Sequence, residues 1–293
     1  MALSVSDILK KVKELEIRSK KLTTNIFTGE YHSAFKGRGM SFKEVREYAA
    51  GDDIRFIDWN TSARFGHPFS KIFEEERELT VMLLIDCSAS NLAGTQTQQK
   101  KELITEMAAV LAFSATSNND KVGALFFTGK TELFVPPKKG KEHVLYIVRQ
   151  LLTMEPVNKE TNIGEALRFF NQTLRHKGIV FLLSDFETKD YEKALKTVSR
   201  RHDCIAIHIH DRIEYQFPKL GLVPVQDAET GKIMWIDSSD PQFTEFWNRS
   251  HLAQNAATQQ LIEKSGWDYL RFETGENYVQ TLQSFFLQRM KKG

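Results

Sequence analysis

Several features that would assign this chain to a special class are scarce or missing. Cysteine occurs twice, at Cys87 and Cys204 in or beside predicted strands, and we interpret both as buried free thiols in a reducing compartment. The net charge is only +2, so charge favours neither nucleic acid nor an acidic membrane surface as a partner. No apolar run approaches the roughly 20 residues of a membrane span, and no signal-peptide core is present. We therefore expect a cytoplasmic protein without a transmembrane segment.

The stretch from Val81 to Ser90 organises the rest of the chain. Its continuous apolar run, residues 81–85, predicts a strand buried on both faces, as in a parallel sheet covered by helices. Asp86, Ser88 and Ser90 follow where this strand ends, the place at which open α/β sheets bind ligands. Carboxylate and hydroxyl oxygens suit Mg²⁺, Mn²⁺ or Ca²⁺ better than zinc. An ordinary helix cap, with a serine bonding backbone N–H groups, would leave the same pattern.

Strands and helices alternate after this stretch, which indicates right-handed crossovers and a doubly wound, mainly parallel sheet with helices on both faces. Two runs that flank a glycine-containing turn predict a β-hairpin insertion at about residues 221–237. Pro136 and Pro137 are expected to end one strand. The predicted strands cover residues 81–85, 122–127, 132–135, 179–183, 204–209 and 267–272. The predicted helices cover residues 97–117, 143–152, 163–174, 191–201, 241–265 and 278–290.

Residues 1–75 precede the sheet domain, residues 76–293, and we expect them to pack on it as a smaller segment. A helix is predicted over residues 5–21 and a strand over 41–48. A dense block of opposite charges follows, in which we expect a paired network around a turn, anchored by a buried Trp59. The block either only fastens the segment to the sheet domain or also forms part of a docking face. Its residues are Arg46, Tyr48, Gly51, Asp52, Asp53, Arg55, Asp58, Trp59 and Arg64.

The pattern Asp86-x-Ser88-x-Ser90 resembles the D-x-S-x-S signature of the von Willebrand factor A fold, where it forms part of a metal-ion-dependent adhesion site (MIDAS). Such a site also takes a threonine from a second loop and an aspartate from a third. Thr161 opens a predicted helix and Asp185 ends a predicted strand, so the resemblance implies that all of these residues hold Mg²⁺, or Mn²⁺ or Ca²⁺. The alternatives are that Thr161 is a helix N-cap and Asp185 a turn residue.

The segment Phe42-x-x-Val45-Arg46-x-Tyr48-x-x-Gly51-Asp52-Asp53-x-Arg55-x-Ile57-Asp58-Trp59-x-x-x-Ala63-Arg64 resembles the hallmark of a bacterial family known as domain of unknown function fifty-eight. Members join such a segment to a von Willebrand A domain and are often encoded beside MoxR-type AAA+ ATPases. The resemblance therefore implies a three-layer von Willebrand A-like fold and a possible AAA+ partner.

Three functions are compatible with these patterns. The first is a non-catalytic, metal-dependent protein-binding module, an adaptor or co-factor of a MoxR-type ATPase, in which a partner's Asp or Glu carboxylate completes the metal coordination. The second is a metal-dependent hydrolase, such as a phosphoesterase, although no general base is evident and Ser88 lacks the setting of a nucleophile elbow. His208 and His210 share a strand face and could in principle bind metal. The third is nucleic-acid binding by two groups of basic residues, which the near-neutral net charge disfavours and which more often form a solvated face. These residues are Lys138, Lys139, Lys141, Arg200 and Arg201.

Overall fold

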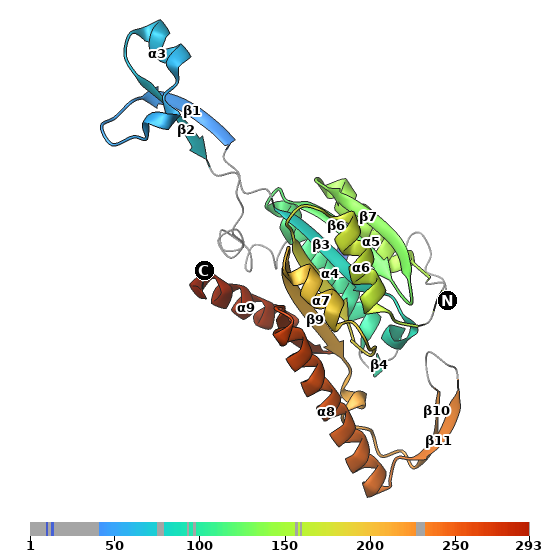
Figure 1. Ribbon diagram of the computed structural model, residues 1–293. Helices are drawn as coiled ribbons and strands as arrows, with labels where there is room; N and C mark the ends of the chain where they lie inside the picture. The colour runs from blue at the N-terminus through green and yellow to red at the C-terminus, as the bar shows by residue number, and fades with distance from the viewer. Residues whose placement is uncertain are drawn as a thin grey trace.

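A six-stranded sheet forms the centre of the protein (Figure 1). The computed structural model describes residues 10, 13, 14, 41–74, 79–92, 94, 95, 98–155, 158, 160–226 and 232–292. The sheet contains β3 (Thr80–Asp86), β6 (Lys121–Phe127), β7 (Thr131–Lys138), β8 (Ile179–Ser184), β9 (Asp203–His210) and β12 (Asp268–Glu273). The strand order is β12-β9-β8-β3-β6-β7, and all neighbours pair in parallel except β6 and β7.

Helices cover both faces of this sheet and create two apolar cores. Successive side chains of β3 point to opposite faces of the sheet, so that Leu83 and Ile85 belong to one core and Met82 and Leu84 to the other. Because both faces are buried, the sequence of β3 is continuously apolar. The first core lies against α4 (Lys100–Ser117), α5 (Lys141–Thr153) and α9 (Tyr278–Lys292). The second lies against α6 (Ile163–Thr173), α7 (Glu192–Ser199) and α8 (Pro241–Lys264). The predicted mainly parallel α/β sheet with helices on both faces is therefore confirmed.

The order of the strands makes β3 the point at which the chain reverses direction across the sheet. From β3 the chain runs through β6 to the edge strand β7, and then returns past β3 to β8, β9 and β12. Crevices at the carboxyl ends of strands at such a switch point are the usual ligand sites of open α/β sheets. The fold therefore predicts a ligand site at the carboxyl ends of β3 and β8.

The prediction that Pro136 and Pro137 end a strand is wrong, because β7 continues through both to Lys138. Since β7 is an edge strand, a residue without a backbone N–H costs no hydrogen bond on its open side. The predicted hairpin is confirmed as β10 (Leu222–Gln226) and β11 (Ile233–Asp237). Shorter elements are η2 (Ala89–Leu92), β4 (Gly94–Thr95), β5 (Gln98–Gln99) and η3 (Arg212–Glu214).

A separate two-stranded sheet precedes β3 in the chain. It pairs β1 (Ser41–Glu47) with β2 (Phe69–Glu74) in antiparallel fashion, and η1 (Ile54–Phe56) and α3 (Trp59–Phe65) lie between them in sequence. The strand predicted over residues 41–48 is confirmed. The helix predicted over residues 5–21 lies outside the described residues, apart from Lys10, Lys13 and Glu14, which are helical. The expected packing of residues 1–75 on the sheet domain stays a prediction.

The charged block lies in this two-stranded unit and differs from the expected buried network. Arg46 pairs with Asp52 at 2.7 Å and Arg55 with Asp53 at 2.6 Å, but the Arg55 side chain is 81% exposed. Trp59 is 71% exposed, so the prediction that its ring is buried as an anchor is wrong.

The predicted paired network implies that Asp58 faces an arginine of the block, such as Arg64. Asp58 instead accepts hydrogen bonds from the backbone N–H groups of Asn60 and Thr61 as the N-cap of α3, and lies 3.8 Å from Lys71. Arg64, in the last turn of α3, is exposed and has no ion pair within the described ranges.

Candidate metal centre

The predicted metal ligands gather at the carboxyl end of the sheet, at its switch point. Asp86 is the last residue of β3, and Asp185 directly follows β8, the parallel neighbour of β3. All of the predicted ligands are buried, with relative exposures of 9% or less: Asp86, Ser88, Ser90, Thr161 and Asp185.

Asp86 is held by hydrogen bonds from different parts of the chain. Its Oδ1 accepts from the backbone N–H of Ser88 at 2.9 Å, and its Oδ2 accepts from Ser184 Oγ at 2.6 Å. Burial, followed by the negative charge of Asp185, raises the pKa of Asp86 to about 7. Two like charges in a buried site are unfavourable, and a cation placed between such groups would relieve that cost.

The serine hydroxyls connect the two carboxylates. Ser88 Oγ and Ser90 Oγ lie 3.0 Å apart, and a hydrogen bond from Ser90 favours the charged form of Asp185. Neither serine caps α4, because Gln99 is the N-cap of that helix. The alternative that these serines cap α4 is therefore excluded, whereas a capping role of Ser88 toward η2, which begins at Ala89, stays open.

Thr161 lies between the ends of β6 and β8. The backbone N–H of its neighbour Asn162 donates to Thr128 O at 3.0 Å, and the hydroxyl of Thr188 donates to Thr161 O at 2.9 Å. Asn162, not Thr161, is the N-cap of α6, and its side chain accepts from the N–H of Glu165. Thr161 Oγ1 is buried and has no hydrogen-bond partner among the described residues. A buried hydroxyl without a partner costs free energy, which a cation ligated by its oxygen would offset.

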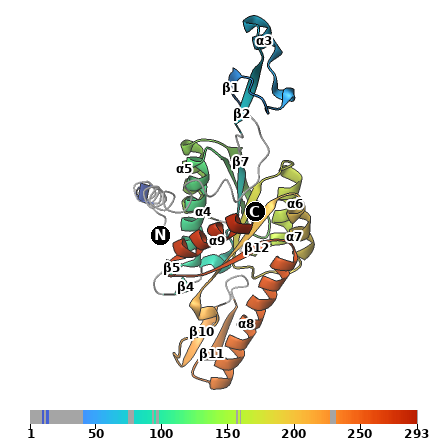
Figure 2. The same ribbon diagram turned by 90° about the vertical axis from the view of Figure 1, so that its left-hand side faces the viewer.

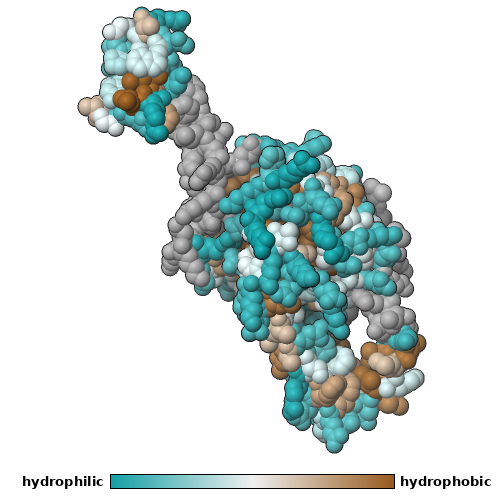
Figure 3. Space-filling view, viewed as in Figure 1, coloured by the Kyte–Doolittle hydropathy of each residue, from teal (hydrophilic) through white to brown (hydrophobic). Residues whose placement is uncertain are grey.

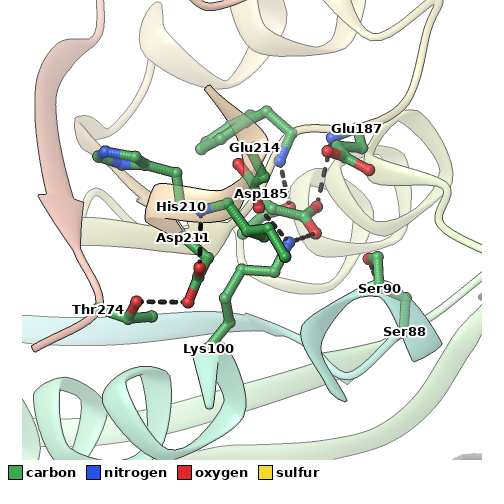
Figure 4. A network of polar contacts seen from close by, with 12 residues as sticks. Ser88, Ser90, Lys100, Asp185, Glu187, His210, Asp211, Glu214 and Thr274 are labelled. Carbon is green, nitrogen blue, oxygen red and sulfur yellow. Dashed lines mark hydrogen bonds and ion pairs between the residues drawn. The ribbon is translucent and has the colours of Figure 1, made fainter. Parts of the chain in front are cut away.

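Lys100 is a member of the site that the sequence patterns did not indicate (Figure 4). Its Nζ donates to Asp185 Oδ2 at 2.9 Å and to Glu214 Oε1 at 2.8 Å, and the residue is 2% exposed. Although burial lowers the pKa of Lys100, the charges of Asp185 and Glu214 outweigh burial and raise it. Burial likewise raises the pKa of Asp185, but the Lys100 ammonium outweighs this effect and lowers it.

One sequence signal could have pointed to this lysine. Lys100 is the first residue of α4, where the positive end of the helix dipole disfavours a cation. An unfavourable cation at a helix start indicates a nearby carboxylate. Nothing comparable marks Glu214, which lies in the short helix η3 after β9.

The donor set suits a hard cation held by hydroxyls and two carboxylates. Within the described residues, no group of three or more His, Cys, Asp or Glu side chains could hold a metal ion. The His208–His210 pair has other contacts, because His208 Nδ1 lies 2.6 Å from Tyr269 Oη and His210 Nδ1 accepts from Arg271 Nε at 3.3 Å. A metal in this region would therefore depend on Ser88, Ser90 and Thr161 in addition to Asp86 and Asp185.

None of the helices in the described ranges is long and apolar enough to cross a membrane. Among solved structures, the chain resembles an aerotolerance-related membrane protein of Bacteroides fragilis with a TM-score of 0.52 and 17% identity, over 73% of this chain and 100% of that chain. This likeness concerns the fold alone.

Sequence comparisons identify relatives that are described as uncharacterized proteins. An uncharacterized protein of Mycobacterium tuberculosis is 28% identical over 283 residues, which cover 96% of this chain and 89% of that protein. An uncharacterized protein of Bacillus subtilis is 31% identical over 107 residues, 36% of this chain and 25% of that protein. Residues 44–257 match the family model described as protein of unknown function DUF58. The chain therefore belongs to the DUF58 family.

Proposed function

We propose that the protein is a non-catalytic, divalent-metal-dependent protein-binding module with a site of the von Willebrand A MIDAS type. The buried Thr161 Oγ1, which has no hydrogen-bond partner among the described residues, carries this proposal. This hydroxyl belongs to a loop that adjoins the ends of β6 and β8, the strands on either side of β3. An ion that binds its oxygen would give it the partner that the protein lacks.

The residues of the site have separable roles. Ser184 and the Ser88 N–H orient Asp86, while Ser88, Ser90 and Thr161 supply hydroxyl oxygens. Asp185 supplies the second carboxylate. When bound, Mg²⁺, Mn²⁺ or Ca²⁺ would offer an open coordination position to an Asp or Glu carboxylate of a protein partner.

An exposed apolar surface on the hairpin β10–β11 supports protein binding. The hairpin β10–β11 and α8 extend beyond the end of the sheet at which β9 finishes (Figures 1 and 2). Figure 3 shows hydrophobic side chains gathered over the hairpin. An exposed patch of this kind is typical of protein interaction sites. Its exposed residues are Leu222, Ile233, Met234 and Trp235.

For the identity of the partner, the family resemblance supports a MoxR-type AAA+ ATPase, and hence a cytoplasmic site of action. A purified ATPase of this type should be captured by the immobilised protein with Mg²⁺ and released by a chelator. Capture that persists in chelator would exclude a metal-dependent contact with that partner.

Titration calorimetry with Mg²⁺ and Mn²⁺ tests the metal site itself. We expect one site in the wild type, strongly weakened in Asp185→Ala and unchanged in Glu165→Ala, which removes an exposed carboxylate from α6. Equal binding by wild type and Asp185→Ala would refute the assignment. Metal-dependent turnover of phosphatase, nuclease or peptidase substrates that Asp86→Ala abolishes would instead favour a hydrolase.

A further inference from the structure

Lys100 places an ammonium group directly on one of the proposed metal ligands. Figure 4 shows its side chain reaching from α4 to Asp185 and Glu214. The Nζ–Oδ2 distance to Asp185 is 2.9 Å and the Nζ–Oε1 distance to Glu214 is 2.8 Å. Both distances are those of charge-assisted hydrogen bonds.

Burial makes this arrangement costly unless its charges balance. The side chains of Lys100, Asp185 and Glu214 are 2%, 0% and 13% exposed, so none of the charges is well solvated. Removing one partner of a buried ion pair leaves an uncompensated charge, which is strongly destabilising. Without a metal, Lys100 therefore supplies the positive charge that makes ionised Asp185 tolerable.

The same contact limits the access of a divalent ion to Asp185. The Oδ2 atom of Asp185 is engaged by Lys100, while Oδ1 accepts from the backbone N–H of Glu187 at 3.3 Å. An ion that approaches this carboxylate meets the repulsion of an ammonium group in a poorly screened environment.

We propose that Lys100 is a built-in counter-cation that competes with the divalent ion for Asp185, with Glu214 as the acceptor that retains Lys100 when the ion binds. The inference rests on the proposed function, since it concerns the regulation of the same metal site. It implies that the ion binds weakly until a partner's carboxylate adds negative charge. Ion binding and partner binding would then be coupled.

Lys100→Met tests the competition, because methionine keeps an unbranched chain and removes the charge. We expect the Mn²⁺ affinity measured by titration calorimetry to rise about tenfold or more, since the site loses a competing cation. In chelator the variant should melt at a lower temperature than the wild type, and Mn²⁺ should raise its melting temperature more. Lys101→Met is the matched control, because Lys101 is the next residue of α4, carries the same charge and donates its Nζ hydrogen bond to Met154 O at 3.4 Å.

Glu214→Gln tests the role of the second acceptor and should act in the opposite direction. In this variant Asp185 is the one of the two acceptors that still carries a charge, so Lys100 would be held more closely by Asp185. The site would also lose a negative charge. For both reasons the Mn²⁺ affinity should fall. A merely structural role of the Lys100–Glu214 pair would not shift the two affinities in opposite directions. If Lys100→Met does not fold, the Mn²⁺ affinity of Glu214→Gln alone tests the proposed competition.

The failure of this inference differs from the failure of the proposed function. If the wild type binds Mn²⁺ and Lys100→Met binds it equally well or more weakly, the proposed competition is wrong, but the proposed metal site stands. Unchanged or tighter binding by Glu214→Gln would lead to the same conclusion. If neither the wild type nor Lys100→Met binds Mn²⁺, both proposals are wrong.

Discussion

Ser184 Oγ donates a 2.6 Å hydrogen bond to Asp86 Oδ2 and so joins the end of β8 to the end of β3. Ser184 Oγ also accepts from the backbone N–H of Phe186 at 3.0 Å, which ties the loop after β8 to the same point. The carboxylate at the centre of the candidate site is therefore oriented by a neighbouring strand as well as by its own loop.

Ser184→Ala should destabilise the protein, because it leaves a buried oxygen of Asp86 without its donor. Such a loss costs on the order of 1–3 kcal/mol in the free energy of unfolding. Denaturant titration measures the change, and Ser117→Ala is the control, since that hydroxyl bonds within its own helix to Phe113 O. If both variants lower the free energy of unfolding equally, the Ser184–Asp86 hydrogen bond stabilises the protein no more than an ordinary hydrogen bond within a helix.

Thr161→Val separates a metal-binding role from a structural one. Valine has a similar shape and removes a hydroxyl that has no hydrogen-bond partner in the described structure, so the melting temperature in chelator should stay the same or rise. The affinity for Mg²⁺ and Mn²⁺ in calorimetry should nevertheless fall. A variant that binds these ions as well as the wild type would remove Thr161 from the site.

Gly123→Ala should be destabilising, because a Cβ at this position of β6 would meet backbone atoms of the edge strand. It would lie 2.9 Å from both Pro137 N and Val135 O, and 2.5 Å from Met82 Sδ. Overpacking of this kind costs about 1–3 kcal/mol. Thermal denaturation measures it against Gly129→Ala, where the nearest atom would lie at 3.5 Å. Equal melting temperatures for the two variants would contradict the packing of β7 on β6.

Acid should destabilise the protein through buried histidines. Burial, and then the charge of Arg201, lowers the pKa of His202 from 6.5 to about 4. Between these values the unfolded chain binds more protons than the folded one, so the free energy of unfolding falls as the pH falls, by at most about 1.4 kcal/mol per pH unit for one histidine.

His202→Phe should therefore reduce the difference in melting temperature between pH 7 and pH 5. Phenylalanine suits the position, because the His202 ring packs on Phe170 with centroids 5.0 Å apart. The exposed His176→Phe serves as the control. An unchanged pH dependence in His202→Phe would show that other groups cause the acid sensitivity.

Arg55→Ala should leave the melting temperature nearly unchanged, because its side chain is 81% exposed, whereas Asp53→Ala also removes the side chain that caps η1 and should lower the melting temperature modestly. Capture of a partner is measured separately on the same variants. Lost capture with normal melting would favour a docking role for the charged block. A large loss of stability would show that the pair fastens the two-stranded unit in a way that its exposure does not suggest.

Local patterns were sufficient to predict most of the helices and strands. The apolar run of β3 requires burial on both faces, and the alternation of strands and helices favours a parallel sheet whatever the long-range contacts are. The resemblance to the von Willebrand A metal site named Asp86, Ser88, Ser90, Thr161 and Asp185 as ligands, and the parallel pairing of β3 with β8 explains why Asp86 and Asp185 lie at one edge of the sheet.

The exposure of a side chain and the identity of its distant partner were decided only by the tertiary structure. An aromatic residue among charges favours burial by composition, yet Trp59 lies on the exposed side of a short helix, where the local pattern gives no information about packing. Lys100 pairs with carboxylates that are 85 and 114 positions away in the sequence. Only the crossovers that place the start of α4 beside the ends of β8 and β9 bring these charges together, and the buried environment then gives their contact its strength.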